Sequence, residues 1–135
     1  MQWSQLRKQL SDRLAPSLAK RLDFHVARYR KAHDEPGRAW VTLDGEEIIS
    51  LSDQQFENEY YPLANEIRRV NQTVRNSLEY RAAYDSARSI ITATKGNFAR
   101  WDFTTAAREF LSLSIEAALT DENPLVRALA VLDRR

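Results

Sequence analysis

The sequence contains no cysteine, and its 135 residues include only three glycines and two histidines. Without cysteine, the chain has no thiol nucleophile, no disulfide and no cysteine-based zinc or iron–sulfur site. Three glycines leave little room for a loop that cradles nucleotide phosphates, and the Gly-x-Ser-x-Gly and His-Glu-x-x-His motifs are both absent. These absences exclude the enzyme classes that such motifs define, and we expect no cofactor.

Long apolar runs are also missing, and no segment approaches the roughly 18–20 residues that a membrane-spanning helix needs. Residues 1–14 alternate charged residues with leucine, which is unlike the apolar core of a secretory signal. The sequence therefore predicts a cytoplasmic protein with no membrane partner. Its content of 43% apolar and 29% charged residues is ordinary for a globular chain, and we expect one α+β domain over residues 1–135.

The signals for β-structure lie between Arg21 and Ser52. Alternating side chains predict three strands, at residues 23–30, 38–43 and 46–51. The segment Asp34-Glu35-Pro36-Gly37 is typical of a turn, because proline presets φ and glycine allows a positive φ. Asp44-Gly45 predicts a tight hairpin. Three strands joined by short connections predict an antiparallel meander.

Most of the remaining chain has the three- and four-residue spacing of helices. Ser4 is the expected N-cap of a first helix that ends at Ala15-Pro16. Ser52 begins a capping box for the helix after the sheet, and Pro62 is expected to interrupt that helix and begin a new one. The predicted fold class is α+β, with an N-terminal helix, a three-stranded antiparallel meander, then three to four helices packed on one sheet face.

Later boundaries follow the same kind of signal. Gly96 fits a helix C-cap, and polar residues around Asn76-Ser77 predict a break. Asp102 or Thr104 could cap the next helix, whose apolar positions continue to Ala118. Asn123 followed by proline predicts the start of a last helix.

Polar and aromatic side chains in the predicted meander form a candidate binding surface. The candidate residues are His25, Tyr29, Arg30, His33, Asp34, Arg38 and Trp40. Arginines bind phosphates or carboxylates, while tyrosine and tryptophan supply stacking area. Strand alternation places His25 and Tyr29 on one face and Arg30 on the other, so we expect these residues to be divided between two faces.

The favoured function is a protein-interaction or binding module rather than an enzyme. Residues 1–40 carry nine Lys/Arg against four Asp/Glu, whereas residues 41–60 carry six acidic residues and no basic one. Blocks of opposite charge can steer a protein partner, or pair with each other across a homodimer.

Nucleic-acid binding is the alternative, because basic side chains with interleaved aromatics neutralise phosphates and stack on bases. A helix, three strands and a helix is also the order of the double-stranded RNA-binding domain, which has a basic run at its second helix. Here that position holds the acidic residues Asp53, Glu57 and Glu59.

A second alternative is a small hydrolase-like enzyme. In that case His25 or His33 is the acid–base group and Asp34 orients it. His33-Asp34 lies beside a Pro-Gly turn rather than on a helix, so the match to His-Asp phosphohydrolases fails and no metal site is expected.

Three patterns in the chain are similar to those of a known family. W-S-x-L begins at Trp3, F-H-x-x-x-Y-R-x-x-H-D begins at Phe24, and G-R-A-W-V-T-x-D-G-x-E-I begins at Gly37. Together with residues 123–135, they resemble a family of small uncharacterised bacterial proteins that includes a Shigella hypothetical protein. The resemblance implies a bacterial origin and no particular activity.

Overall fold

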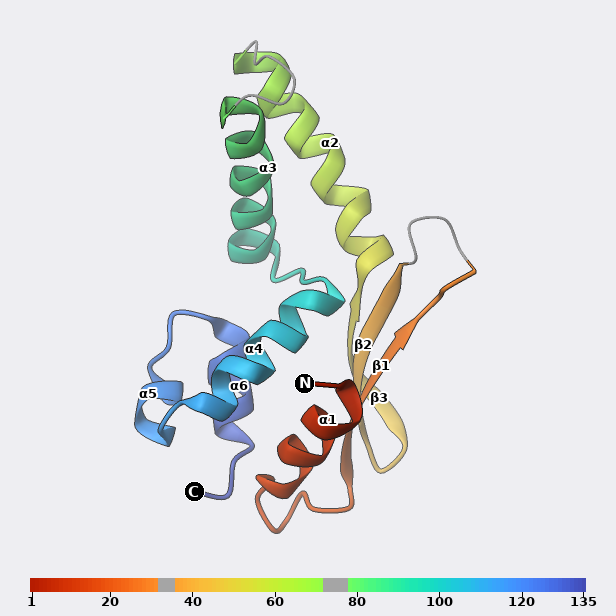
Figure 1. The fold of residues 1–135 in the computed structure, drawn as a ribbon, viewed down its shortest axis with the longest axis vertical. Coiled ribbons are helices and arrows are strands. Elements are labelled where there is room, and N and C mark those ends of the chain that lie inside the picture. The colour runs from red at the N-terminus through yellow and green to blue at the C-terminus, as the bar shows by residue number, and fades with distance from the viewer. Residues whose placement is uncertain (32–35, 72–77) are drawn as a thin grey trace.

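The computed structural model describes residues 1–31, 36–71 and 78–135. Figure 1 shows one N-terminal helix, a three-stranded sheet and a series of helices, so the predicted fold class is confirmed. The elements in chain order are α1 (Trp3–Asp12), β1 (Leu22–Arg28), β2 (Gly37–Leu43), β3 (Glu46–Ser52), α2 (Asp53–Asn71), α3 (Leu78–Ile90), the π-helix η1 (Ile91–Lys95), α4 (Arg100–Ser112), α5 (Ile115–Leu119) and α6 (Pro124–Val131).

The sheet is antiparallel with the strand order β1-β2-β3. Asp44 has a φ of 51° and Gly45 a φ of 84°, which are the positive values that the predicted β2–β3 hairpin requires. The β2–β3 register shifts between Val41 and Thr42, so Ile48 is an extra residue in β3 and forms a bulge. The first strand ends at Arg28 and not at Arg30 as predicted.

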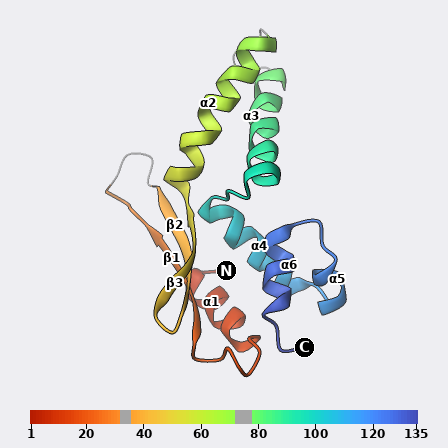
Figure 2. The same cartoon turned by 180° about the vertical axis from the view of Figure 1, so that it is seen from behind.

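Helices α1 and α4 lie on the same side of the sheet in both Figure 1 and Figure 2. Leu22 and Phe24 of β1 and Ala39 and Val41 of β2 are buried on this side, with Phe24 and Ala39 each 1% exposed. Phe24 packs on Phe103 of α4 with ring centroids 6.1 Å apart, and Leu6 and Leu10 of α1 join the same core. Burial of each large apolar side chain stabilises the fold by about 1.5–3 kcal/mol.

Asp53, the first residue of α2, is buried at 2% exposure and connects three elements. Its carboxylate accepts hydrogen bonds from the backbone N–H of Gly37 at 3.0 Å and from the backbone N–H of Arg100 at 2.7 Å. The Nε of Arg100 donates a third hydrogen bond at 3.1 Å. Because all three donors converge on one buried carboxylate, the starts of β2, α2 and α4 are held together.

Helix α2 continues through Pro62, so the predicted break at this residue is wrong. Proline removes one backbone donor, but Pro62 lies on the exposed side of the helix, where water can satisfy the carbonyl group left without a partner. The opposite side packs on α3, where Tyr60 and Tyr84 have ring centroids 5.6 Å apart. This packing outweighs the cost of the proline. The predicted break at residues 76–77 lies outside the described residues.

Two predicted N-caps are also wrong. Helix α1 begins at Trp3 after Gln2, so Ser4 lies inside the helix, and the helix ends at Asp12, before Ala15-Pro16. Helix α4 begins at Arg100, so neither Asp102 nor Thr104 is its N-cap.

The carboxylate of Asp102 instead accepts the backbone N–H of Ala99 at 2.8 Å from within the first turn of α4. Gly96 has a φ of 60° at the end of η1, and Asn123 accepts the N–H of Leu125 at the start of α6, so these two predictions are confirmed.

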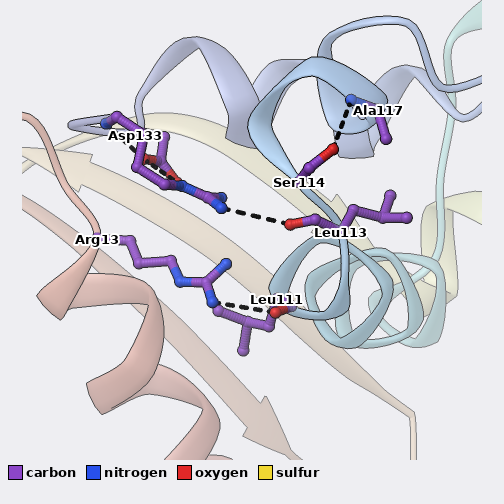
Figure 3. Close-up of polar contacts among 7 residues, drawn as sticks. Arg13, Leu111, Leu113, Ser114, Ala117 and Asp133 are labelled. Carbon is purple, nitrogen blue, oxygen red and sulfur yellow. Dashed lines mark hydrogen bonds and ion pairs between the residues drawn. The ribbon is translucent and has the colours of Figure 1, made fainter.

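The predicted helix from Asp102 to Ala118 is divided into α4 and α5. Leu113 is extended, and the hydroxyl of Ser114 accepts the backbone N–H of Ala117 at 3.2 Å, which caps α5 (Figure 3). The C-terminal carbonyls of α4 are bound by two arginines from distant segments. Arg13 donates to the carbonyl of Leu111 at 3.0 Å, and Arg135 donates to that of Leu113 at 3.3 Å. These contacts satisfy groups that a helix end leaves unpaired.

Candidate functional site

The outer face of the sheet, which is the face opposite α1 and α4, carries polar and aromatic side chains. Its residues alternate with buried ones such as Phe24 and Val41. We define the outer face as Asp23, His25, Ala27, Arg38, Trp40, Thr42, Glu47 and Ser50. Among residues 1–31, 36–71 and 78–135, neither view of the fold places a helix over this face (Figures 1 and 2).

Three side chains form a stacked group on the outer face, which we call the Trp40 cluster: His25, Arg38 and Trp40. His25 and Trp40 are direct cross-strand partners, and their rings lie 4.9 Å apart at an interplanar angle of 12°. The Cζ of Arg38 lies 4.1 Å from the centroid of the Trp40 ring, within the range of a cation–π interaction. The three residues therefore form one contiguous surface.

Hydrogen bonds hold the outer two members of the cluster. The Nε2 of His25 lies 2.9 Å from the hydroxyl of Thr42. Arg38 Nη1 donates to Glu47 Oε1 at 2.8 Å and to the hydroxyl of Ser50 at 3.3 Å. The hydrogen bond from Arg38 lowers the pKa of the Glu47 carboxyl and raises the pKa of the Arg38 guanidinium. The guanidinium is thus oriented before any ligand arrives.

Tyr29 and Arg30 follow β1 and are exposed, Tyr29 at 50%. The Tyr29 backbone N–H donates to the carbonyl of Pro36 at 2.8 Å, which continues the β1–β2 pairing beyond the strand. Its side chain interacts with Arg38 and contributes to the raised pKa of that guanidinium. Tyr29 therefore lies near Arg38, one member of the Trp40 cluster. His33 and Asp34, the other two candidate residues, lie outside the described residues.

The hydrolase-like alternative used His25 or His33 as the acid–base group with Asp34 to orient it. Because His33 and Asp34 lie outside the described residues, the structure does not test this alternative. Among residues 1–31, 36–71 and 78–135, no group of three or more histidine, aspartate or glutamate side chains could hold a metal ion. Within the same ranges, no helix combines the length and the apolar character that crossing a membrane requires.

Sequence reasoning missed a cleft of about 890 Å³ between α3, η1 and the first turns of α4 and α6. Its lining includes the charged residues Arg88, Asp102, Glu122 and Arg127. These residues come from three segments separated by loops and helices, so no local motif joins them. The signal that the sequence did offer was Gly96, which was interpreted only as a helix C-cap.

A comparison with curated proteins and with solved structures finds no significant match. A family model does match the chain over nearly its whole length, residues 2–135. The chain therefore belongs to the SF0329 protein family.

Proposed function

We propose that this chain is a protein-interaction module that binds an acidic segment of a partner protein through the outer face of its sheet. One observation carries the proposal: the Trp40 cluster lies on a sheet face over which the described part of the chain places no helix. A sheet face in an α+β protein usually carries such aromatic groups on its packed side. Their presence on the open side favours a binding role.

The composition of the surface matches the residues that dominate protein interfaces. Tryptophan, tyrosine and arginine are enriched among the residues whose truncation costs most binding energy. Here Trp40, Tyr29 and Arg38 meet in one place. Because Arg38 is already oriented by Glu47, less side-chain entropy is lost when a partner carboxylate binds beside it.

The charge around the cluster favours an acidic partner. Arg30 and Lys31 follow Tyr29 beyond the end of β1 and are exposed. The acidic groups on the outer face are already paired, since Asp23 binds Arg7 and Glu47 binds Arg38. The surface therefore presents donors to an approaching chain, and carboxylates are their natural acceptors.

The geometry of Trp40 favours a protein over a nucleic acid. Base stacking needs an open aromatic face. The Trp40 ring already contacts the His25 ring and the Arg38 guanidinium, which leaves less of its π-surface for a base. A peptide with acidic side chains can bind at the edges of the cluster and at the N–H donors of Arg38, without access to an open ring face.

Selection from a random peptide library against the full chain tests the proposal. Selected peptides are expected to be enriched in aspartate and glutamate. Trp40→Ala or Arg38→Ala should lower the affinity of the chain for these peptides by at least about tenfold. Matched controls are Tyr61→Ala and Arg81→Ala, both exposed residues on the α2–α3 pair. Tyr29→Ala and Tyr61→Ala remove tyrosines of similar exposure, 50% and 48%. A difference in peptide affinity between these two variants therefore reports where the tyrosine lies, and not merely the loss of a tyrosine side chain.

Two results would contradict the proposal. One is a set of peptides that bind Trp40→Ala and Arg38→Ala as tightly as the wild type. The other is the absence of peptide binding together with oligonucleotide binding whose affinity falls steeply with salt, which is the signature of phosphate contacts.

A further inference from the structure

The cleft between α3, η1, α4 and α6 has the size of a small-molecule site. Its volume of about 890 Å³ lies within the range of about 300–1,000 Å³ that is typical of ligand pockets. Apolar residues, Phe98 and Leu125 among them, share the lining with charged and hydroxyl side chains. The cleft thus offers apolar contact area together with a few polar groups.

Arg88 of α3 is held in place from several sides. It forms an ion pair with Asp102, whose other carboxylate oxygen accepts the Ala99 backbone N–H. The Arg88 Cζ also lies 5.3 Å from the ring of Trp101 and 5.6 Å from that of Phe56. A guanidinium has five N–H donors, more than one carboxylate oxygen can use, so donors remain for a ligand.

Arg127 lies in the first turn of α6, where two backbone carbonyls hold its guanidinium. Its Nη1 donates to the carbonyl of Asp121 at 2.6 Å and to that of Glu122 at 3.0 Å. Neutral carbonyls orient the guanidinium but do not cancel its charge. Arg127 therefore presents an oriented guanidinium to the cleft, beside Arg88, whose charge is paired with that of Asp102.

The backbone beside the cleft is irregular. Residues 91–95 form a π-helix, a rare geometry that is frequent at functional sites, and Gly96 ends it with a φ of 60°. Gly96 and Thr92 both line the cleft. This irregular turn is a second, independent feature of the cleft, beside its paired arginines.

We infer that the cleft binds a small organic anion. Arg88 and Arg127 hold its carboxylate or phosphate group, and its apolar part packs on Phe98 and Leu125. The cleft lies apart from the outer face of the sheet, so the inference does not rest on the proposed protein-interaction function.

Titration of the full chain with phenyl phosphate and with benzoate tests this inference, with benzyl alcohol and benzamide as neutral counterparts. Calorimetry should show saturable 1:1 binding of an anion and no binding of its neutral counterpart. Arg127→Gln should lower the affinity for the anion by at least about tenfold, because one charged hydrogen-bond donor is lost. Arg108→Gln, an exposed arginine of α4 outside the cleft, should leave affinity unchanged.

The side-chain Nε–H resonances of Arg88 and Arg127 in the wild-type protein give a readout that needs no variant. Both should shift as either anion binds. The inference is wrong if neither anion binds saturably, if the neutral compounds bind equally well, or if Arg127→Gln binds as the wild type does. Anion-induced shifts at the Trp40 indole in place of Arg88 and Arg127 would also overturn it, because they would place the anion on the outer face of the sheet.

Discussion

The Asp53 carboxylate accepts the backbone N–H of Gly37 at 3.0 Å, in a position where only 2% of Asp53 is exposed. Through this contact the first residue of β2 is tied to the first residue of α2, and through Arg100 both are tied to α4. Trp40 lies three residues further along β2. The junction at Asp53 therefore sets how the outer face of the sheet is held relative to the helices.

Replacing Asp53 with alanine should destabilise the fold strongly. The change leaves the guanidinium of Arg100 and two backbone donors without their acceptor, and the loss of one partner of a buried pair costs about 3–5 kcal/mol. Urea unfolding measures the difference. The exposed Asp12, paired with Lys8 on the surface of α1, is the control, and Asp12→Ala should cost less than about 0.5 kcal/mol. Equal stabilities for the two variants would contradict the role of the junction.

Gly37→Ala should destabilise the β1–β2 pair for a different reason. A Cβ at position 37 would lie 2.2 Å from the carbonyl oxygen of Ala27, so the two strands would have to separate. We expect a cost of about 1–3 kcal/mol, as for other overpacked sites.

Gly45 gives a matched control. Its φ of 84° strains any L-residue, asparagine least, but no atom lies within 4 Å of a Cβ at that position. Gly45→Asn should therefore cost only this backbone strain, about 1 kcal/mol, while Gly37→Asn should be at least as unstable as Gly37→Ala. Tolerance of Gly37→Asn in urea unfolding would show that the close approach is not limiting.

Local chemistry predicted the sheet well but not the contacts that position it. Asp44-Gly45 is a strong local signal, and the hairpin is where it was expected. The expectation that Gly37 supplies a positive φ is wrong: its φ is not positive, and its need is for close approach to Ala27. The buried role of Asp53 was not predicted, since its partner Arg100 is 47 residues away and no spacing rule connects them.

The grouping of the candidate surface residues could also be predicted only in part, because some of their contacts join residues that are far apart in the sequence. Arg38 and Trp40 alternate along one strand, so their shared face follows from the sequence. The stacking of His25 on Trp40 depends on the β1–β2 register, and the long connection between these strands gives no local rule for it. The break between α4 and α5 was missed because apolar residues continue through Leu113, while the arginines that bind the α4 carbonyls come from distant segments.

Asp133 should make the stability of the protein sensitive to acid. Burial acts to raise its pKa, but hydrogen bonds from the side chain and backbone of Arg135 outweigh burial, so the pKa of Asp133 lies below its ordinary value. The folded state therefore favours the ionised form. The resulting stabilisation is complete above the ordinary pKa of about 3.9 and is lost as the pH falls through the lower folded value.

Urea midpoints measured at several pH values check this effect. The difference between wild type and Asp133→Asn should be constant above about pH 5 and should shrink below about pH 4. A difference that grows as the pH falls would mean that the sign of the shift is wrong.

Glu47→Gln should strengthen the binding of an acidic peptide. The substitution removes a negative charge beside Arg38 and leaves that guanidinium without its carboxylate partner, so a partner carboxylate meets less repulsion and a freer donor. Isothermal titration with a selected acidic peptide measures the change. Glu109→Gln, an exposed position on α4, is the control for net charge. Weaker binding by Glu47→Gln would contradict this expectation and show that the orientation of Arg38 by Glu47 matters more than the charge that is removed.

Binding of an acidic peptide at the Trp40 cluster is tested most directly by the indole N–H resonances of the protein. The chain has three tryptophans, so the other two act as internal controls. Trp3 of α1 packs on Phe103, and Trp101 of α4 packs on Phe56. On titration with an acidic peptide selected against the chain, the Trp40 indole and the amides of β1 and β2 should shift most. Shifts confined to Trp3, Trp101 or the α2–α3 amides, with Trp40 unchanged, would contradict binding at the outer face.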